Sequence, residues 1–447
     1  GKKNAGLLTE GSIAKGILAF AIPLFLGQLL QQFYNVADAW VVGNFADNDS
    51  FAAVSSAGSL TFLIIGFFNG IAIGGGVVIS KYFGARDEKS VEVAIHTNSL
   101  FGLIASALST IVGLILIPVL LRLMQTPENV LPASLLYLRV YFAGVSTIIM
   151  YNIGMSIMRA LGDSLHPLYY LFISSVINVV LDLLFVAVFH WGVGGAAAAT
   201  MCVYRMCKME GVARLDFKKL HYNGPMMHEV ITQGLPTGIQ NSVISIGNIV
   251  IQKNINSFGS FAMAGVGAYS KLEGFAFLPI TCMSMALPTF ISQNLGAKEY
   301  NRAKKGAVFG IITGVAVAEL IGIGFYIGIE PLLRFFVDEE QSVSYGEMHA
   351  HVTTLFFCLL AFSHCAAGVL RGCGKSIIPM AAMLAFWCGL RIVYVTTALE
   401  FIPKFTMISW AYPLTWSCSS IVFLLFLIFS DWTHAFEKKA AKSKVIK

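Results

Sequence analysis

Three polar side chains lie inside segments that are otherwise strongly apolar. Asp38 interrupts the segment FYNVADAWVVG, and Asn178 and Asp182 interrupt SSVINVVLDLLF, where their i, i+4 spacing places them on one helix face. A charge at the centre of a lipid bilayer costs at least about 2.5–3.5 kcal/mol, so such residues usually serve function. Their oxygen atoms could bind a small cation, two nearby carboxyls could carry a proton, or each carboxylate could hold a packing network.

The elements that carry these residues are predicted to be transmembrane helices. The 447-residue chain is 56% hydrophobic and only 12% charged, whereas a soluble domain carries about 25% charged residues. Apolar runs indicate twelve helices that span the bilayer, so the predicted fold class is an all-α polytopic membrane protein. The sixth run, which ends near Arg205, is too short to cross the hydrocarbon core alone.

The distribution of Lys and Arg predicts the orientation. With both termini in the cytoplasm, 23 of the 30 basic residues fall in inner segments and five in outer segments. This bias predicts a multi-pass protein of the cell inner membrane with both termini cytoplasmic. The same segments explain the positive net charge, so no nucleic-acid partner is expected, and the basic tail is expected to touch anionic membrane lipids.

The sequence contains an internal repeat. The segment ISKYFGARDE at 79–88 recurs as ISQNLGAKEY at 291–300, and MRALGDSLHP at 158–167 recurs as LRGCGKSIIP at 370–379, at the same offset along the chain. Pro23 and Pro236 correspond at nearly the same offset. We therefore predict two pseudo-symmetric six-helix bundles in a parallel repeat: an N-terminal lobe at 1–205, a basic cytoplasmic linker at 206–226, a C-terminal lobe at 227–430 and a basic cytoplasmic tail at 431–447.

The repeat separates shared scaffold from candidate function. At these offsets, Asp38, Asn178 and Asp182 correspond to Ile251, Leu390 and Tyr394 in the second repeat. The polar set is therefore confined to one lobe. Parallel repeats of this kind occur in transporters that bind substrate near the bilayer midplane between the halves.

The segments IPLFLGQLLQQFYNVADAWVVG, GARDEKS with its copy GAKEYNR, and MRALGDSLHP resemble the multidrug and toxic compound extrusion (MATE) family over nearly the whole chain. The resemblance implies two six-helix lobes with a cleft between them and export of amphiphiles driven by inward sodium or proton movement. It also implies an ion site, and a metal site if the ion is sodium, at Asp38, Asn178 and Asp182, joined by Thr200. No cofactor is expected beyond the coupling ion.

The resemblance places the substrate cleft between the first, second, seventh and eighth helices. Its sparse polar contacts are expected from Gln28, Gln31, Tyr34, Asn69, Gln240, Asn241 and Glu273. An apolar wall of this kind discriminates weakly among lipophilic small molecules, and acids on it favour cations. Glu273 could instead pair with Lys271, which would remove that preference.

The predicted protein is a monomeric secondary active exporter that works by alternating access. Pro23 removes a backbone hydrogen bond from the first helix and is a candidate hinge. The alternative is a lipid-linked precursor flippase of the same superfamily, which would need basic residues along the cleft. An enzyme is not expected, because no loop is long enough to hold a catalytic domain.

Overall fold

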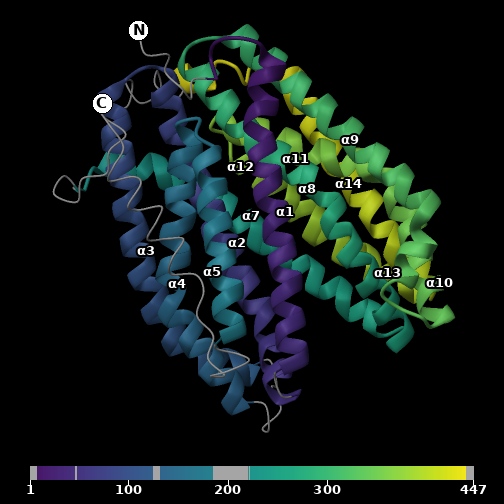
Figure 1. Cartoon of the computed structure of the whole chain (residues 1–447). Helices are drawn as coiled ribbons and strands as arrows, with labels where there is room; N and C mark the ends of the chain where they lie inside the picture. The colour runs from purple at the N-terminus through teal and green to yellow at the C-terminus, as the bar shows by residue number, and fades with distance from the viewer. Residues whose placement is uncertain (1–7, 46–47, 124–130, 185–219, 221, 439–447) are drawn as a thin grey trace. The chain divides into compact units, whose positions relative to one another are not determined.

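The computed structural model describes residues 8–45, 48–123, 131–184, 220 and 222–438, and the helices of this part are shown in Figure 1. Side chains are not described for residues 34–65 and 177–184, among others. The longer helices are α1 (Ile13–Phe45), α2 (Asn48–Gly84), α3 (Glu88–Leu123), α4 (Leu131–Ala160), α5 (Leu165–Leu184), α7 (Gly224–Asn256), α8 (Ser260–Gly296), α9 (Tyr300–Arg334), α10 (Glu340–Thr353), α11 (Phe357–Gly372), α12 (Ile377–Met383), α13 (Arg391–Phe401) and α14 (Phe405–Phe429). No strand occurs among the described residues.

Seven helical stretches in the described part are long and apolar enough to cross a membrane. They include two interrupted helices. The stretch Glu340–Gly372 contains a short 3-10 segment, Thr354–Phe356, between α10 and α11. The stretch Ile377–Phe401 contains a π-helix, Leu384–Leu390, between α12 and α13. At the first interruption, the Glu319 carboxylate accepts a hydrogen bond of 3.0 Å from the backbone N–H of Cys358, which gives this intramembrane acid a structural role.

The backbone confirms that the repeat in the sequence is also a repeat in structure. Gly162 and Gly374 both adopt positive φ, at 80° and 78°, in the two copies of the same turn. Arg86 and Lys298 adopt positive φ of 55° and 61° in the copies GARDE and GAKEY, although left-handed backbone is uncommon for residues other than glycine. Each pair is separated by the offset of the copied segments, so both loops have kept their conformation in the two halves.

The chain divides into two compact units, each with its own core. One comprises Leu26–Gly238, and the other comprises Leu8–Phe25 with Ile239–Lys447. In the first unit, α2 and α3 pack against α4 around Ile79, Ile95 and Ile149. In the second, α8 packs against α9 and α11 around Leu287, Phe290 and Phe357.

The helices α1 and α7 each pass from one unit to the other. The crossing lies between Phe25 and Leu26 in α1 and between Gly238 and Ile239 in α7, at equivalent places in the two repeats. Both crossings follow a proline in the helix, Pro23 or Pro236, by the same number of residues. The compact units therefore follow packing contacts, whereas the lobe limits predicted from the repeat follow the sequence and stay a prediction.

Small residues hold the first half of α7 against α2 within the first unit. A Cβ atom added to Gly70 would lie 2.5 Å from the backbone nitrogen of Gly238, and one added to Gly234 would lie 2.8 Å from the Ile71 carbonyl oxygen. Gly74 approaches Gly234 similarly. Both helices thus carry glycines at i, i+4 spacing, a pattern that lets two helix backbones approach closely in a membrane.

The N-terminal ends of α1 and α7 are also fixed by polar contacts. Glu229, near the start of α7, binds the Lys81 ammonium and accepts a 2.9 Å hydrogen bond from the Tyr82 hydroxyl. The Arg302 guanidinium donates hydrogen bonds to the carbonyl oxygens of Leu8, Glu10 and Gly11 before α1. Each contact lies inside one unit, so each helix start is attached to the unit into which it packs.

Candidate functional site

The predicted ion site belongs to the first unit. Asp38 lies on α1, and Asn178 and Asp182 lie on α5. The two helices meet at Gly27, where an added Cβ atom would lie 3.5 Å from the Leu171 side chain. The side chains of Asp38, Asn178 and Asp182 lie outside the described residues, as do the side chain of Tyr34 and all of Thr200, so the ligand set stays a prediction.

The predicted substrate-contacting residues divide between the two units. Gln28 and Asn69 are half-buried and Gln31 is exposed in the first unit. In the second unit, Asn241 and Glu273 are half-buried. The structure describes each set within its own unit, and the shared cleft stays a prediction.

Gln240 is buried in the second unit. Its side-chain nitrogen lies 2.8 Å from the sulfur of Met383, whereas its carbonyl oxygen has no hydrogen-bond partner among the described residues. An unsatisfied buried acceptor is costly unless a ligand or water completes it. Contact between Gln240 and the substrate stays a prediction.

Glu273 on α8 belongs to a polar network inside the second unit. It interacts with the hydroxyl of Tyr269, and its charge acts on the guanidinium of Arg391. The Tyr269 hydroxyl also lies 2.7 Å from the Thr353 hydroxyl. Lys271 points elsewhere, because its ammonium lies 5.5 Å from the ring centroid of Phe336. The basic neighbour of Glu273 is therefore Arg391 and not Lys271, and a role for Glu273 in substrate contact stays a prediction.

Arg391 is the largest fully buried side chain among the described residues, and it lies at the start of α13. Its guanidinium donates hydrogen bonds to the side-chain oxygen of Asn248, at 3.3 Å, and to the hydroxyl of Thr415, at 2.9 Å. The rings of Tyr412 and Trp387 lie 4.6 Å and 5.4 Å from its central carbon. Arg391 lies inside an apolar run of the sequence, which marks it as an intramembrane charge, whereas Asn248 and Thr415 are ordinary polar residues until the fold brings them together.

His349 extends this network. Its ring lies edge-on to Tyr269 and Tyr412, with centroids 5.2 Å and 5.3 Å away, and Nδ1 lies 2.9 Å from the Ser409 hydroxyl. The described residues contain no group of three His, Cys, Asp or Glu that could hold a metal ion. The second unit is therefore organised around a protein cation, Arg391, with one carboxylate nearby.

Internal repeats of transmembrane helices are common in transporter folds. The family model MatE matches residues 23–184 and again residues 236–397, which together are well over half of the chain. The chain therefore belongs to the MATE family of transporters and is an integral membrane protein with the family's twelve-helix, two-repeat fold.

Known relatives cover almost the whole chain. It is 26% identical over 390 residues to the probable multidrug resistance protein YpnP of Bacillus subtilis, covering 85% of this chain and 87% of the relative. It is 21% identical over 412 residues to the multidrug export protein MepA of Staphylococcus saprophyticus, covering 90% of each. A solved transporter of the MOP superfamily from Pyrococcus furiosus has the same fold, with a TM-score of 0.87 and 19% identity over 97% of this chain and 99% of that chain.

Proposed function

We propose that the protein is a secondary active multidrug exporter that moves lipophilic, mainly cationic compounds out of the cell in exchange for sodium ions or protons. Membership of the MATE family and the names of two relatives, a multidrug export protein and a probable multidrug resistance protein, support export of small molecules. The protein would act as a monomer in the bacterial inner membrane with both termini in the cytoplasm.

One observation carries the proposed ion site, namely the way α1 and α5 pack. Consecutive membrane helices alternate in direction, so the first and fifth helices run the same way. Gly27 and Leu171 mark the contact point of the two helices. The step along α1 from Gly27 to Asp38 equals the step along α5 from Leu171 to Asp182, and it spans about three helical turns, or about 16 Å. The equal steps from this contact support an ion site in which Asp38 and Asp182 share one depth.

This placement explains how ion binding could drive transport. Two carboxylates and the Asn178 amide on adjoining helices supply hard oxygen ligands for sodium. The same carboxylates, if both charged, would repel each other and favour uptake of one proton. Either ion neutralises the site, and release on the other side of the membrane restores its charge.

The ion site is tested by Asp38→Asn and Asp182→Asn in the full-length protein. We expect both variants to insert into the membrane and to lose drug efflux. The matched control is Tyr394→Phe, at the linear counterpart of Asp182 in the second repeat, which should transport normally. Reconstituted vesicles with an imposed sodium gradient or an imposed proton gradient identify the coupling ion. Undiminished efflux in both aspartate variants would refute the site.

The preference for cations is tested at Glu273. Glu273→Gln is expected to weaken export of quaternary ammonium dyes several-fold while leaving neutral compounds less affected, because the positive charge of Arg391 would then lack its nearby carboxylate and would repel cations. Lys271→Gln is the control, since Lys271 contacts Phe336 and should not influence this preference. Equal losses for cationic and neutral compounds would refute the cation preference. Transport of an anionic lipid precursor alone would favour a flippase.

A further inference from the structure

The contacts of Arg391 come from the three helices that correspond to those of the predicted ion site. In the first repeat that site draws on the first, fifth and sixth helices. Their counterparts in the second repeat are α7, the helix that contains α12 and α13, and α14. Asn248 lies on α7, Arg391 begins α13, and Thr415 lies on α14. The guanidinium therefore lies where the second repeat would hold its own ion.

The chemistry of this position suits a cation. The amide oxygen of Asn248 and the hydroxyl of Thr415 accept hydrogen bonds from the guanidinium, and two aromatic rings flank it. Oxygen acceptors and π faces are the groups that stabilise a positive charge away from water. Only 2% of Arg391 is exposed, and its Nε has no hydrogen-bond partner in the part of the chain that the structure describes.

A π-helix gives Arg391 its place in this arrangement. By the offset of the copied segments, Asn178 corresponds to Leu390. The segment Leu384–Leu390 is π-helical, whereas the corresponding part of α5 is a regular α-helix. A π turn contains one residue more than an α turn. After that extra residue the register shifts by one, and Arg391 takes the position of Asn178.

The π-helix is fixed by its neighbours. A Cβ atom added to Gly247 on α7 would lie 2.8 Å from the Trp387 carbonyl oxygen, so α7 passes close to the π turn. The indole nitrogen of Trp387 donates a 3.0 Å hydrogen bond to the Ser419 hydroxyl on α14. The same two helices that supply oxygen acceptors to Arg391 thus hold the widened turn that presents it.

We propose that the Arg391 guanidinium is a tethered cation that fills the second repeat's counterpart of the ion site, and that shortening this side chain opens a site for a free guanidinium-type cation. The comparison between repeats rests on the ion site of the proposed function, but the cation site itself rests only on contacts within the second unit. A permanently filled site cannot exchange ions. Coupling is then confined to the first repeat, with Glu273 as the nearby carboxylate that balances the fixed charge.

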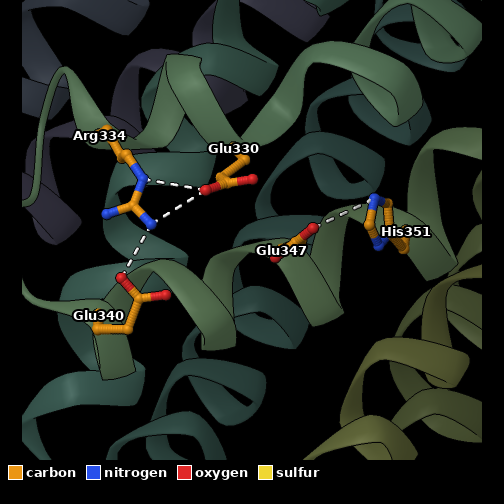
Figure 2. A network of polar contacts seen from close by, with 5 residues as sticks. All are labelled: Glu330, Arg334, Glu340, Glu347 and His351. Carbon is orange, nitrogen blue, oxygen red and sulfur yellow. Dashed lines mark hydrogen bonds and ion pairs between the residues drawn. The ribbon is translucent and has the colours of Figure 1, made fainter.

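The test is chemical rescue of Arg391→Ala. Thermal unfolding of the full-length protein in detergent is followed with added methylguanidinium chloride, against sodium chloride at the same concentration. We expect Arg391→Ala to melt below wild type and methylguanidinium to raise its melting temperature by about 1–4 °C through binding to the folded state. Wild type should show no such rise. The control is Arg334→Ala, since Arg334 forms exposed ion pairs with Glu330 and Glu340 at the α9–α10 junction (Figure 2).

A methylguanidinium response of Arg391→Ala no larger than that of Arg334→Ala would overturn the proposal. If the alanine variant does not accumulate, Arg391→Lys and Arg391→Met decide the question. Both side chains are unbranched and shorter than that of arginine, but only lysine keeps the charge. We expect the lysine variant to be the more abundant and the more heat-stable, and a lysine variant no better than methionine would overturn the proposal. These measurements do not depend on transport, so loss of the proposed coupling site would leave them unchanged.

Discussion

Replacement of Gly70 by alanine tests the close packing of α2 on α7. The new Cβ atom would lie 2.5 Å from the Gly238 nitrogen and 2.6 Å from the Thr237 carbonyl carbon. Both are backbone atoms, so no side chain can turn away and the helices must separate by about 1 Å to restore normal contact. Overpacking of this kind costs about 1–3 kcal/mol, and alanine's higher helix propensity returns up to about 1 kcal/mol. We expect a net destabilisation of about 1–2 kcal/mol.

The control for Gly70→Ala is Gly144→Ala in α4. A Cβ atom at Gly144 would meet no described atom within 4 Å, so this variant should be neutral or slightly stabilised. The assay is thermal unfolding of both variants in the same detergent, with Gly70→Val as a larger perturbation. If Gly70→Ala and Gly144→Ala melt together, the close α2–α7 packing does not contribute to stability and the reasoning fails.

Two further predictions concern polar contacts in the first unit. Glu229→Gln removes the charge bound by Lys81 and should lower the free energy of unfolding by about 1–2 kcal/mol, because both partners are mostly buried. The control is Glu330→Gln, in an exposed ion pair, which should lower it by no more than about 0.5 kcal/mol in the same unfolding assay. Asp87 caps α3 through its bonds to Ser90, which lower the pKa of its carboxyl. A carboxyl whose pKa is lowered in the folded protein stabilises the fold at pH values above its ordinary pKa. This stabilisation is lost as the pH falls through the folded-state pKa. Asp87→Ala should therefore cost about 1 kcal/mol at neutral pH and progressively less in acid, and a cost independent of pH would contradict this role.

The features that the sequence predicted best are those that depend on local chemistry or on repetition. Twelve apolar runs and a twofold repeat follow from hydropathy and from copied segments, and the family fold confirms both. The turn at Gly162 and its copy at Gly374 have the same backbone because the same short motif folds in the same way. The predicted ion site followed from the cost of an intramembrane charge, which requires no knowledge of contacts.

The features that the sequence could not predict depend on contacts between distant segments. The passage of α1 and α7 between units becomes visible only when packing partners are known. The π-helix before Arg391 has no composition signal, because LAFWCGL would also suit a regular helix. By the sequence offset, Asn178 corresponds to Leu390. Only the register observed after the π-helix brings Arg391 to the position of Asn178.

The crossings in α1 and α7 give the predicted hinge a structural partner. Pro23 precedes the point where α1 leaves the second unit, and Pro236 precedes the equivalent point in α7. Each proline lacks a backbone N–H, so bending there disrupts fewer hydrogen bonds than elsewhere in the helix. Asp38 lies on α1 beyond the crossing, in the unit that also contains the start of α7. Neutralisation of Asp38 would therefore act on a unit that two helices, each with an equivalent proline, join to the other unit. Replacement of only one of these prolines should impair transport only partly.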